Sequence, residues 1–504
     1  MPAFELEEAT VAGAARALAE RSLTVAELTA AYLARIETID GGPAGPNAVL
    51  ELNPDALDIA RELDVELDAG RSRGPLHGIP VLVKDNIDTA DGMLTTAGSL
   101  ALTESRPQRD ADCVARLRDA GAVILGKANL REWANFRSTA STSGWSGRGG
   151  QTWNPYVLDR SPCGSSSGSA AAVAANLTMV ALGSETDGSI VCPSSVCGVV
   201  GIKPTVGLVS TAGVIPISHS QDCVGVHART VADAAALLEV IASPVDGGSA
   251  RAYLSGLRPD ALRGARLGVM RQQFGGYSPA ADRMFEGALA ALRECGAVLV
   301  DAALLPSADE LATSKAELTV MYHEFHAGLD AYLAARGDPS VRSMGDVMAF
   351  NIAHADAEML HFGQEHMEAA VQTGGLDDPA YIAARAECVR LSRTEGLDAL
   401  LDAQHLDGLV ALTGGPAWLV DYISSDHYAG SSSEPAAIAG YPAVTVPMGM
   451  IAAELPVGIT FVGRAFTEAT LLGFAHAFEQ ATSARRPPRF LPTLRPHKAG
   501  APSH

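Results

Sequence analysis

No run of 18 uninterrupted apolar residues occurs in this sequence of 504 residues. A helix that spans a bilayer needs roughly 20 predominantly apolar residues, so we expect no transmembrane segment. Residues 1–22 are acidic and lack the apolar core of a secretion signal, which predicts a cytoplasmic protein. The alternative is a chain whose export signal has already been removed.

Basic residues are also few. The sequence has 37 Lys plus Arg against 58 Asp plus Glu, for a net charge of -21. Such an excess of carboxylates repels polyanions, so neither nucleic acid nor an anionic membrane is expected as a partner. A hydrophobic fraction of 47% with 19% charged residues is typical of a globular protein. A chain of this length buries a large core without needing disulfides or a metal.

The seven cysteines include no CxxC pair. Their odd number and scattered positions predict reduced thiols that pack as small buried side chains in a cytosolic protein. Cys163 and Cys192 flank two serine-containing segments, and we interpret them as packing residues rather than nucleophiles. The glycine-rich segments lack the GK[ST] ending of a phosphate-binding loop, so no nucleotide cofactor is expected.

Lysine is the scarcest charged residue type. Of the 37 basic residues, 32 are arginine and five are lysine, namely Lys84, Lys127, Lys203, Lys315 and Lys498. Lys84 lies in the apolar run IPVLVKDNI (79–87), where burial disfavours its charged form. Because arginine cannot give up its proton, a lysine at this place suggests a group that must titrate. The alternative is a structural lysine in a salt bridge with the neighbouring Asp85.

Strand and helix patterns alternate along the chain. This alternation predicts an α/β fold with one large mixed sheet covered by helices on both faces. Thr24 and Glu27 match a capping box, which predicts a helix from that point. The predicted strands are IPVLVKDNI (79–87), AVILGKANL (122–130), TMVALGS (178–184), ARLGVM (265–270), AVLVDA (297–302), LDGLVAL (406–412), AVTVPMG (443–449) and LPVGITFVG (455–463).

The stretch around 306–405 differs from the rest because it is almost wholly helical and rich in histidine. No linker or repeat divides the chain, so we predict a single domain over 1–504 with a helical insertion around 306–405. The histidines at 323, 326, 361 and 366 lack the HExxH spacing of zinc sites. We interpret them as structural or surface residues, which could line a substrate entrance, and we expect no metal.

A serine- and glycine-rich segment, SPCGSSSGS (161–169), leads directly into an alanine-rich helix. Helix N-terminal amides and small side chains favour anions and a close approach of the backbone. Ser166 is also the centre of a G-x-S-x-G match. The nucleophile elbow of α/β-hydrolases requires a strand just before that serine, whereas NPYVLDRSPC has two prolines and no adequate strand. A flexible serine-rich loop remains the alternative.

A second small-residue turn, GSETDGSI (183–190), follows an apolar strand. Such a turn can direct successive backbone N–H groups at one point, as an oxyanion hole requires. Ser189 at its end could supply a nucleophile beside those donors. The alternative is an ordinary turn at the end of a strand.

Together, these segments resemble the amidase signature family. The resemblance rests on GSSSGSAAAVAANLTMVALGSETDGSIVCP (164–193) and GVVGIKPTVGLVS (198–210), with HGIPVLVKDN (77–86) upstream and GYPAVTVPMG (440–449) and LPVGITFVG (455–463) downstream. It covers nearly the whole chain in family order. EWANFR (132–137), RGGQTWNPY (148–156), SPCGSSSGSA (161–170) and ETDGSIVCP (185–193) make it closest to bacterial peptide amidases.

The resemblance implies a Ser–cis-Ser–Lys triad. In this sequence, Ser189 corresponds to the nucleophile, Ser165 to the bridging serine and Lys84 to the base. Family members have a cis peptide bond before the bridging serine, here between Gly164 and Ser165. Ser166 is implied to support the relay by hydrogen bonding.

The resemblance also implies an oxyanion hole built from the backbone amides of Thr186, Asp187, Gly188 and Ser189. At position 187 many members have glycine, so the Asp187 side chain either lines the pocket or caps the turn. Many members carry arginine two residues after the nucleophile, where this sequence has Val191. That departure disfavours the tRNA-dependent amidotransferase subunits and agrees with the peptide amidase subset.

The implied function is that of a serine amidohydrolase without metal or cofactor. The expected substrates are small-molecule or peptide amides, foremost C-terminal peptide or amino-acid amides, which would yield a carboxylate and ammonia. One alternative is an aryl or aliphatic acylamidase of the same family. Another, of a different class, is a complex-dependent subunit of the amidotransferase type. The sequence leaves open whether the protein is a monomer or a homo-oligomer.

Overall fold

The computed structural model describes residues 4–42, 44–244, 252–301 and 303–494. Its centre is one sheet of 11 strands, accompanied by a separate two-stranded ribbon of β4 (Trp145–Ser146) and β5 (Gly150–Gln151). The strands of the main sheet are β1 (Val49–Leu52), β2 (Pro80–Lys84), β3 (Val123–Ala128), β6 (Val180–Glu185), β7 (Val200–Lys203), β8 (Cys223–Ala228), β9 (Arg266–Val269), β10 (Val298–Val300), β11 (Gly408–Leu412), β12 (Ala443–Ile451) and β13 (Leu455–Val462).

The sheet is mixed. Its strand order is β1-β3-β2-β6-β8-β7-β12-β13-β11-β9-β10. Strand β2 runs parallel to both β3 and β6, whereas β6 runs antiparallel to β8. Every residue of β2, β3 and β6 is buried, as expected for strands that have helices on both faces. The prediction of an α/β fold with one large mixed sheet is therefore confirmed.

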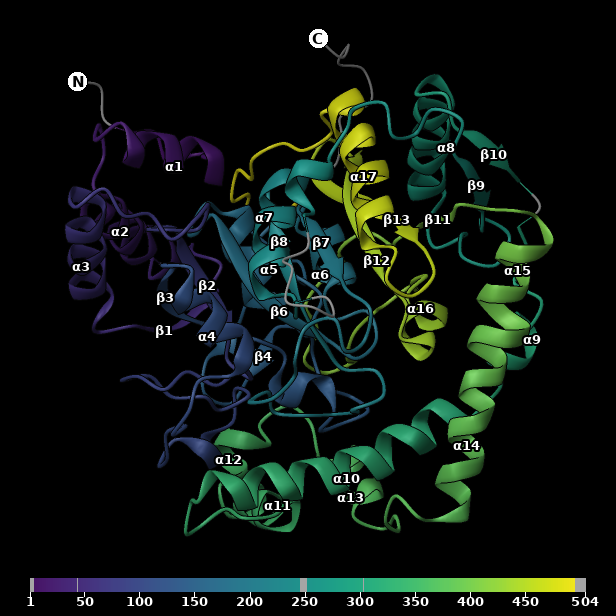
Figure 1. The fold of residues 1–504 in the computed structure, drawn as a ribbon. Coiled ribbons are helices and arrows are strands. Elements are labelled where there is room, and N and C mark those ends of the chain that lie inside the picture. Colours follow the sequence, from purple (N-terminus) through teal and green to yellow (C-terminus); the bar gives the residue numbers. More distant parts are fainter. Residues whose placement is uncertain (1–3, 43, 245–251, 302, 495–504) are drawn as a thin grey trace.

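Helices surround the sheet (Figure 1). Those outside the segment from 308 to 403 are α1 (Val11–Ala19), α2 (Val25–Arg35), α3 (Ala56–Asp68), α4 (Asp112–Asp119), α5 (Ser167–Ala174), α6 (Val191–Val196), α7 (Val231–Ile241), α8 (Pro279–Glu294), α16 (Glu434–Ala439) and α17 (Glu468–Thr482). Short 3-10 or π turns are η1 (Ile36–Asp40), η2 (Leu100–Leu102), η3 (Glu132–Asn135), η4 (Leu254–Gly256) and η5 (Arg390–Leu397). The predicted capping box is present at the start of α2, where Glu27 N lies 3.1 Å from Thr24 Oγ1 and Thr24 N lies 2.9 Å from Glu27 Oε2.

Seven further helices follow one another between β10 and β11, drawn in green along the bottom and right of Figure 1. They are α9 (Ala308–Leu311), α10 (Ala316–Arg336), α11 (Met344–Ala353), α12 (Ala355–Glu358), α13 (Glu365–Ala370), α14 (Pro379–Val389) and α15 (Asp398–Ala403). Phe325, Leu329 and Leu333 of α10 share a buried apolar cluster with Trp133 and Phe136. Through this cluster the helical segment packs against the loop that follows β3. That residues 1–504 form a single domain stays a prediction.

Three strands of the main sheet were not predicted, namely β1, β8 and β7, whose four residues include Gly201 and Lys203. Strand β1 is a four-residue edge strand, too short to give a clear alternation. Strand β8 contains Gly225 and His227, which interrupt its apolar pattern. The last residue of the predicted strand 297–302 lies outside the described residues. Within the described ranges, no helix combines the length and the apolar composition needed to cross a membrane.

Candidate active site

Lys84 is the last residue of β2 and its side chain is fully buried. Its ammonium donates hydrogen bonds to Ser165 Oγ at 2.7 Å, to Ser184 Oγ at 2.9 Å and to Ser184 O at 3.1 Å. Burial lowers the pKa of Lys84 to about 7, although Asp222 and Glu185 oppose the shift with their negative charges. An amine with this pKa can exchange a proton with a bound serine near neutral pH.

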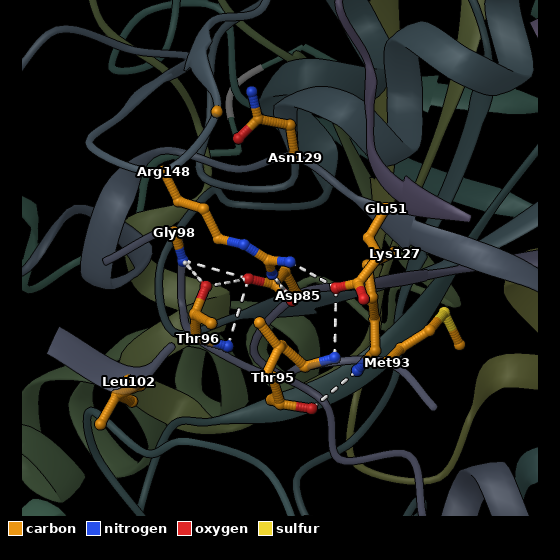
Figure 2. Close-up of polar contacts among 12 residues, drawn as sticks. Glu51, Asp85, Met93, Thr95, Thr96, Gly98, Leu102, Lys127, Asn129 and Arg148 are labelled. Atoms are coloured by element: carbon orange, nitrogen blue, oxygen red, sulfur yellow. Dashed lines mark hydrogen bonds and ion pairs between the residues drawn. The ribbon is translucent and has the colours of Figure 1, made fainter. Parts of the chain in front are cut away.

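Asp85 does not pair with Lys84; no ion pair between them is found in the part of the chain that the structure describes. Figure 2 shows that the Asp85 carboxylate instead accepts hydrogen bonds from Thr96 and from Gly98 N at 3.3 Å. Arg148 Nη1 lies 3.5 Å from the same carboxylate. The alternative of a structural Lys84–Asp85 salt bridge is therefore wrong, and Lys84 has hydroxyl and carbonyl partners instead.

Two other lysines are also fully buried. Lys127 Nζ donates to Ile87 O at 2.6 Å and to Thr95 Oγ1 at 2.7 Å, close to the Asp85 network (Figure 2). Lys203 Nζ donates to Tyr441 O at 2.8 Å. Full burial of a lysine in this chain is therefore not by itself a sign of a group that must titrate. Lys84 differs from both because its shortest hydrogen bond goes to a hydroxyl group beside a pocket.

Ser165 follows a cis peptide bond with Gly164, as the family resemblance implied. The loop that carries it is held from two sides. Arg131 N donates to Ser165 O at 3.0 Å, and Ser166 N donates to Ser189 O at 3.1 Å. No strand precedes Ser166 directly, so the segment lacks the strand that a nucleophile elbow of the α/β-hydrolase type needs. The Ser166 hydroxyl donates to Ser184 O at 3.0 Å, which links this loop to the end of β6.

Ser189 lies in the turn between β6 and α6, and its residue is 7% exposed. The backbone N–H groups of residues 186–189 donate no hydrogen bond within the described part of the chain. The next two amides are satisfied, because Glu185 Oε2 accepts from Ile190 N at 2.5 Å and from Val191 N at 3.0 Å. The Glu185 carboxylate therefore binds the two amides that follow the turn and leaves the four amides of residues 186–189 available for a ligand.

Thr186 is anchored from the other side of the turn, since its hydroxyl donates to Asp222 Oδ1 at 2.6 Å. Gly188 adopts the left-handed conformation with φ at 75°, and a Cβ on it would lie 3.1 Å from Ser433 Oγ. Both features fix the course of the turn. A side chain at Gly188 would strain the backbone and narrow the pocket.

A pocket of about 500 Å³ lies over this turn. This size suits a small organic ligand. Its lining includes Gly164, Asp187, Gly188, Ser189, Ser433 and Glu434. The pocket thus joins the cis-peptide loop to the turn that carries Ser189. Among the described residues Ser165 Oγ and Ser189 Oγ are not hydrogen bonded to each other, and the roles assigned to them stay predictions.

Cys163 and Cys192 form a disulfide, with their Cα atoms 6.1 Å apart. The prediction that all seven cysteines are reduced is therefore wrong, and so is the interpretation of this pair as packing thiols. The pair has a sequence separation of 29 and no CxxC spacing, so only the fold brings the two residues together. The bond links the residue before Gly164 to the helix after Ser189. It removes the support that reduced thiols gave to a cytoplasmic location, which stays a prediction.

Five cysteines are free, and four of them, Cys113, Cys197, Cys223 and Cys388, are buried as expected for packing residues. Three residues that hold the site together were missed in the sequence: Ser184, Glu185 and Asp222. Ser184 and Glu185 belong to the conspicuous turn 183–190, but their side chains could not be distinguished from ordinary strand-end residues. Asp222 lies more than 30 residues downstream of Thr186, so no local pattern could connect the two.

The histidines of the helical segment lie outside this pocket lining. His323 Nδ1 is 2.9 Å from Thr319 O, and His366 Nδ1 is 3.0 Å from Tyr322 Oη. His361 stacks on Tyr422 with ring centroids 4.2 Å apart. In the ranges described, no group of three or more His, Cys, Asp or Glu side chains is arranged to hold a metal ion.

Gly168, in the first turn of α5, provides a stability test of the loop that carries Ser165. A Cβ at this position would lie 2.6 Å from Asn129 N and closer still to Ala48 O, and neither backbone atom can move away like a flexible side chain. Gly168→Ala is therefore expected to lower the free energy of unfolding by about 2 kcal/mol or more through overpacking. Urea unfolding measures this change. The control is Gly287→Ala in α8, where a Cβ would meet nothing within 4 Å; equal stability of the two variants would contradict the tight packing.

Comparisons with known proteins agree with this geometry. The family model for amidases matches residues 27–472. The crystal structure of the peptide amidase from Stenotrophomonas maltophilia is 51% identical and superposes with a TM-score of 0.90, covering 97% of this chain and 100% of that one. A peptide amidase in complex with the competitive inhibitor chymostatin superposes with a TM-score of 0.91 at 51% identity, covering 96% and 100% of the two chains. A probable amidase from Arabidopsis thaliana is 41% identical over 505 residues, which are 97% of this chain and 93% of that protein. The chain therefore belongs to the amidase signature family.

Proposed function

We propose that this amidase hydrolyses C-terminal carboxamides of peptides or amino acids to a carboxylate and ammonia. Ser189 would act as nucleophile, Ser165 as proton relay and Lys84 as base. The observation that carries the proposal is the 2.7 Å hydrogen bond between Lys84 Nζ and Ser165 Oγ in a fully buried setting beside the pocket. As a member of its family, the protein is a hydrolase of carbon–nitrogen bonds similar to peptide amidases.

The first step is the attack of Ser189 Oγ on the carbonyl carbon of the substrate. A serine hydroxyl attacks an amide only if its proton is removed as the new bond forms. That proton passes to Ser165 Oγ, while the Ser165 proton passes to the neutral amine of Lys84. The electron pair of the carbonyl π bond moves to oxygen, and this oxyanion accepts hydrogen bonds from the free backbone amides of residues 186–189.

In the second step the tetrahedral intermediate collapses. The proton held by Lys84 returns through Ser165 to the substrate nitrogen, the carbon–nitrogen bond breaks, and ammonia leaves. The acyl group remains as an ester on Ser189. Water then attacks this ester, and its proton follows the same path to Lys84. That proton returns through Ser165 to Ser189 Oγ as the ester bond breaks, and the acid loses its remaining proton to solvent and leaves as a carboxylate.

The nature of the substrate is supported by the pocket and by the relatives. The lining of the pocket that contains Ser189 includes the polar residues Asp187, Ser433 and Glu434. The same lining includes Arg131 and Asp426, which form an ion pair at 3.2 Å, and the aromatic residue Trp418. The 51% identical peptide amidase binds chymostatin as a competitive inhibitor. We infer that the pocket accepts the C-terminal end of a peptide.

A panel of peptide amides, amino-acid amides, aryl amides and internal peptides tests this proposal. Purified protein should release ammonia from peptide amides and amino-acid amides without ATP or a partner protein, and should leave internal peptide bonds intact. The Ser189→Ala variant is the matched control for contaminating amidases. Preference for anilides or long aliphatic amides would replace the proposal with an acylamidase. Activity that requires ATP and further subunits would indicate an amidotransferase-type subunit.

A further inference from the structure

Asp187 presents two different hydrogen-bonding groups to the pocket. Its backbone N–H is one of the unpaired amides of the turn that carries Ser189. The residue also lines the pocket over this turn. The Oδ1 atom is buried and has no hydrogen-bond partner among the described residues, although buried carboxylate oxygens nearly always have one. An unpaired acceptor of this kind beside a nucleophile indicates a contact that substrate supplies.

A structural role as the cap of the turn does not account for this side chain. The amides that follow the turn are bonded to Glu185 Oε2, at 2.5 Å from Ile190 N and 3.0 Å from Val191 N. The capping position is therefore already filled by another carboxylate. Of the two alternatives left open by the sequence, the pocket-lining role of Asp187 agrees with the observed contacts.

The surroundings keep an acceptor available at Asp187. Burial raises the pKa of Asp187, and the hydrogen bond from Ser433 and the charge of Lys203 oppose this shift. A carboxyl group retains an acceptor oxygen in either protonation state. Burial and the charge on Asp187 raise the pKa of its neighbour Glu317 to about 8, which favours the neutral form of Glu317 at pH 7. Gln221 Nε2 donates a hydrogen bond to Glu317 Oε1 at 2.8 Å. Glu434, with a pKa raised to about 7 by burial, lies on the pocket side.

We propose that Asp187 recognises the scissile carboxamide itself, its backbone N–H binding the carbonyl oxygen and its Oδ1 accepting a hydrogen bond from the amide nitrogen. This inference rests on the proposed function. Oxygen and nitrogen of a carboxamide are attached to one carbon, so a residue whose amide holds the oxygen needs only a short side chain to reach the nitrogen. The α-ammonium of an amino-acid amide is one bond farther from the carbonyl carbon.

This contact gives the site a means of preferring amides to esters. An ester has no N–H, so in an ester complex the buried Oδ1 would stay unpaired, as it is among the described residues of the free protein, whereas an amide supplies the missing hydrogen bond. A site built to bind an N–H rejects analogues that lack it far more strongly than an apolar pocket discriminates by size. Asp187 is therefore a specificity-determining residue, and it moves no proton in the reaction.

The test compares an N-acetyl amino-acid amide with the methyl ester of the same acid in full-length Asp187→Asn and Asp187→Ala variants. In Asp187→Ala we expect kcat/KM for the amide to fall about 100-fold, and in Asp187→Asn, which keeps an Oδ1 acceptor, to fall less. In both variants kcat/KM for the ester should change less than about 3-fold. Ester turnover and the melting temperature report whether each variant is folded. Glu317→Gln is the matched control, because it removes the neighbouring carboxylate and should leave the ratio of amide to ester activity within about 3-fold of wild type.

Three results would overturn the inference. Equal losses for amide and ester would assign Asp187 to the geometry of the turn. A loss seen only for substrates with a free α-amino group, compared with their N-acetyl forms, would assign it to binding of an ammonium. An unchanged ratio in both variants would show that the side chain does not contact the substrate. Wild-type protein that cleaves no amide at all would instead overturn the proposed function, and this inference with it.

Discussion

Replacing Ser189 with alanine is expected to reduce amide turnover by about four to six orders of magnitude, as loss of the nucleophile does in other serine hydrolases. Without Oγ no acyl-enzyme can form, and only binding and the oxyanion hole remain. The fold should be unaffected, because the variant removes one oxygen atom at the pocket and leaves the backbone bond from Ser166 N to Ser189 O intact. Steady-state ammonia release and a thermal melt measure the two effects.

The pocket provides a matched control for this variant. Ser431 also lines the pocket, and its hydroxyl lies 2.8 Å from Ser433 Oγ; no lysine in the described ranges is bonded to it. Ser431→Ala is expected to reduce kcat/KM by less than about 10-fold. If Ser431→Ala abolished turnover while Ser189→Ala retained it, the assignment of the nucleophile would be wrong.

Replacing Lys84 is expected to have the second-largest effect. Lys84→Ala and Lys84→Arg should each lower kcat/KM by about three orders of magnitude or more, because general-base catalysis alone contributes about 10²- to 10⁴-fold. Arginine keeps the positive charge but cannot give up its proton, so its failure separates a base from a merely structural cation. Kinetic assays with melting temperatures measure both variants.

Lys127→Met is the control for the loss of a buried lysine. Lys127 is equally buried, but its partners Ile87 O and Thr95 Oγ1 are outside the pocket lining. This variant should lower the free energy of unfolding and leave turnover per folded molecule within about 10-fold of wild type. A similar catalytic loss in Lys127→Met and Lys84→Ala would contradict a specific role for Lys84.

The same base predicts the pH dependence. Lys84 accepts a proton only in its neutral form, and burial lowers its pKa to about 7. The reactive form is therefore present above this pH, and kcat/KM should fall as the pH drops through 7. His227 does not compete as the titrating group, because burial and the charge of Lys84 lower its pKa to about 3. Glu434 is a second group with a pKa of about 7, because burial raises its pKa. In Glu434→Gln the fall of kcat/KM below pH 7 should persist, since the account assigns this fall to Lys84.

The sequence was sufficient for the fold class because the central strands are continuous apolar runs. Strands β2, β3 and β6 are completely buried, so their residues had to be hydrophobic almost throughout. The edge strand β1 pairs on one side only and needs no such run. Strand β8 is central but tolerates His227, whose Nδ1 lies 2.8 Å from Ser194 Oγ. A local pattern cannot anticipate such a distant partner.

The sequence predicted the site residues in three separate segments, but it did not predict the side-chain contacts that connect these segments. Ser184 contributes both a hydroxyl and a carbonyl to Lys84. Glu185 closes the turn before Ser189. These contacts arise where the ends of β2 and β6 meet, which depends on the pairing of the two strands. The sequence held the residues but could not provide this pairing.

The disulfide shows the limit of reasoning from spacing. Cys163 precedes Ser165 and Cys192 follows Ser189. Nothing in their spacing distinguished them from the cysteines that are buried and free. Only the approach of the loop before α5 to helix α6 places them within bonding distance. The same approach brings the Ser165 loop to Ser189, since Ser166 N donates to Ser189 O at 3.1 Å. The missed disulfide and the predicted pair of serines therefore depend on one contact between the same two segments.

Mapping of a covalent adduct tests the central claim most directly. Protein treated with a fluorophosphonate should carry a single adduct on Ser189, identified by peptide mass spectrometry. Labelling should disappear in Ser189→Ala and become much slower in Lys84→Ala, because the hydroxyl is activated through Ser165. An adduct on another serine, or equally fast labelling without Lys84, would contradict the account.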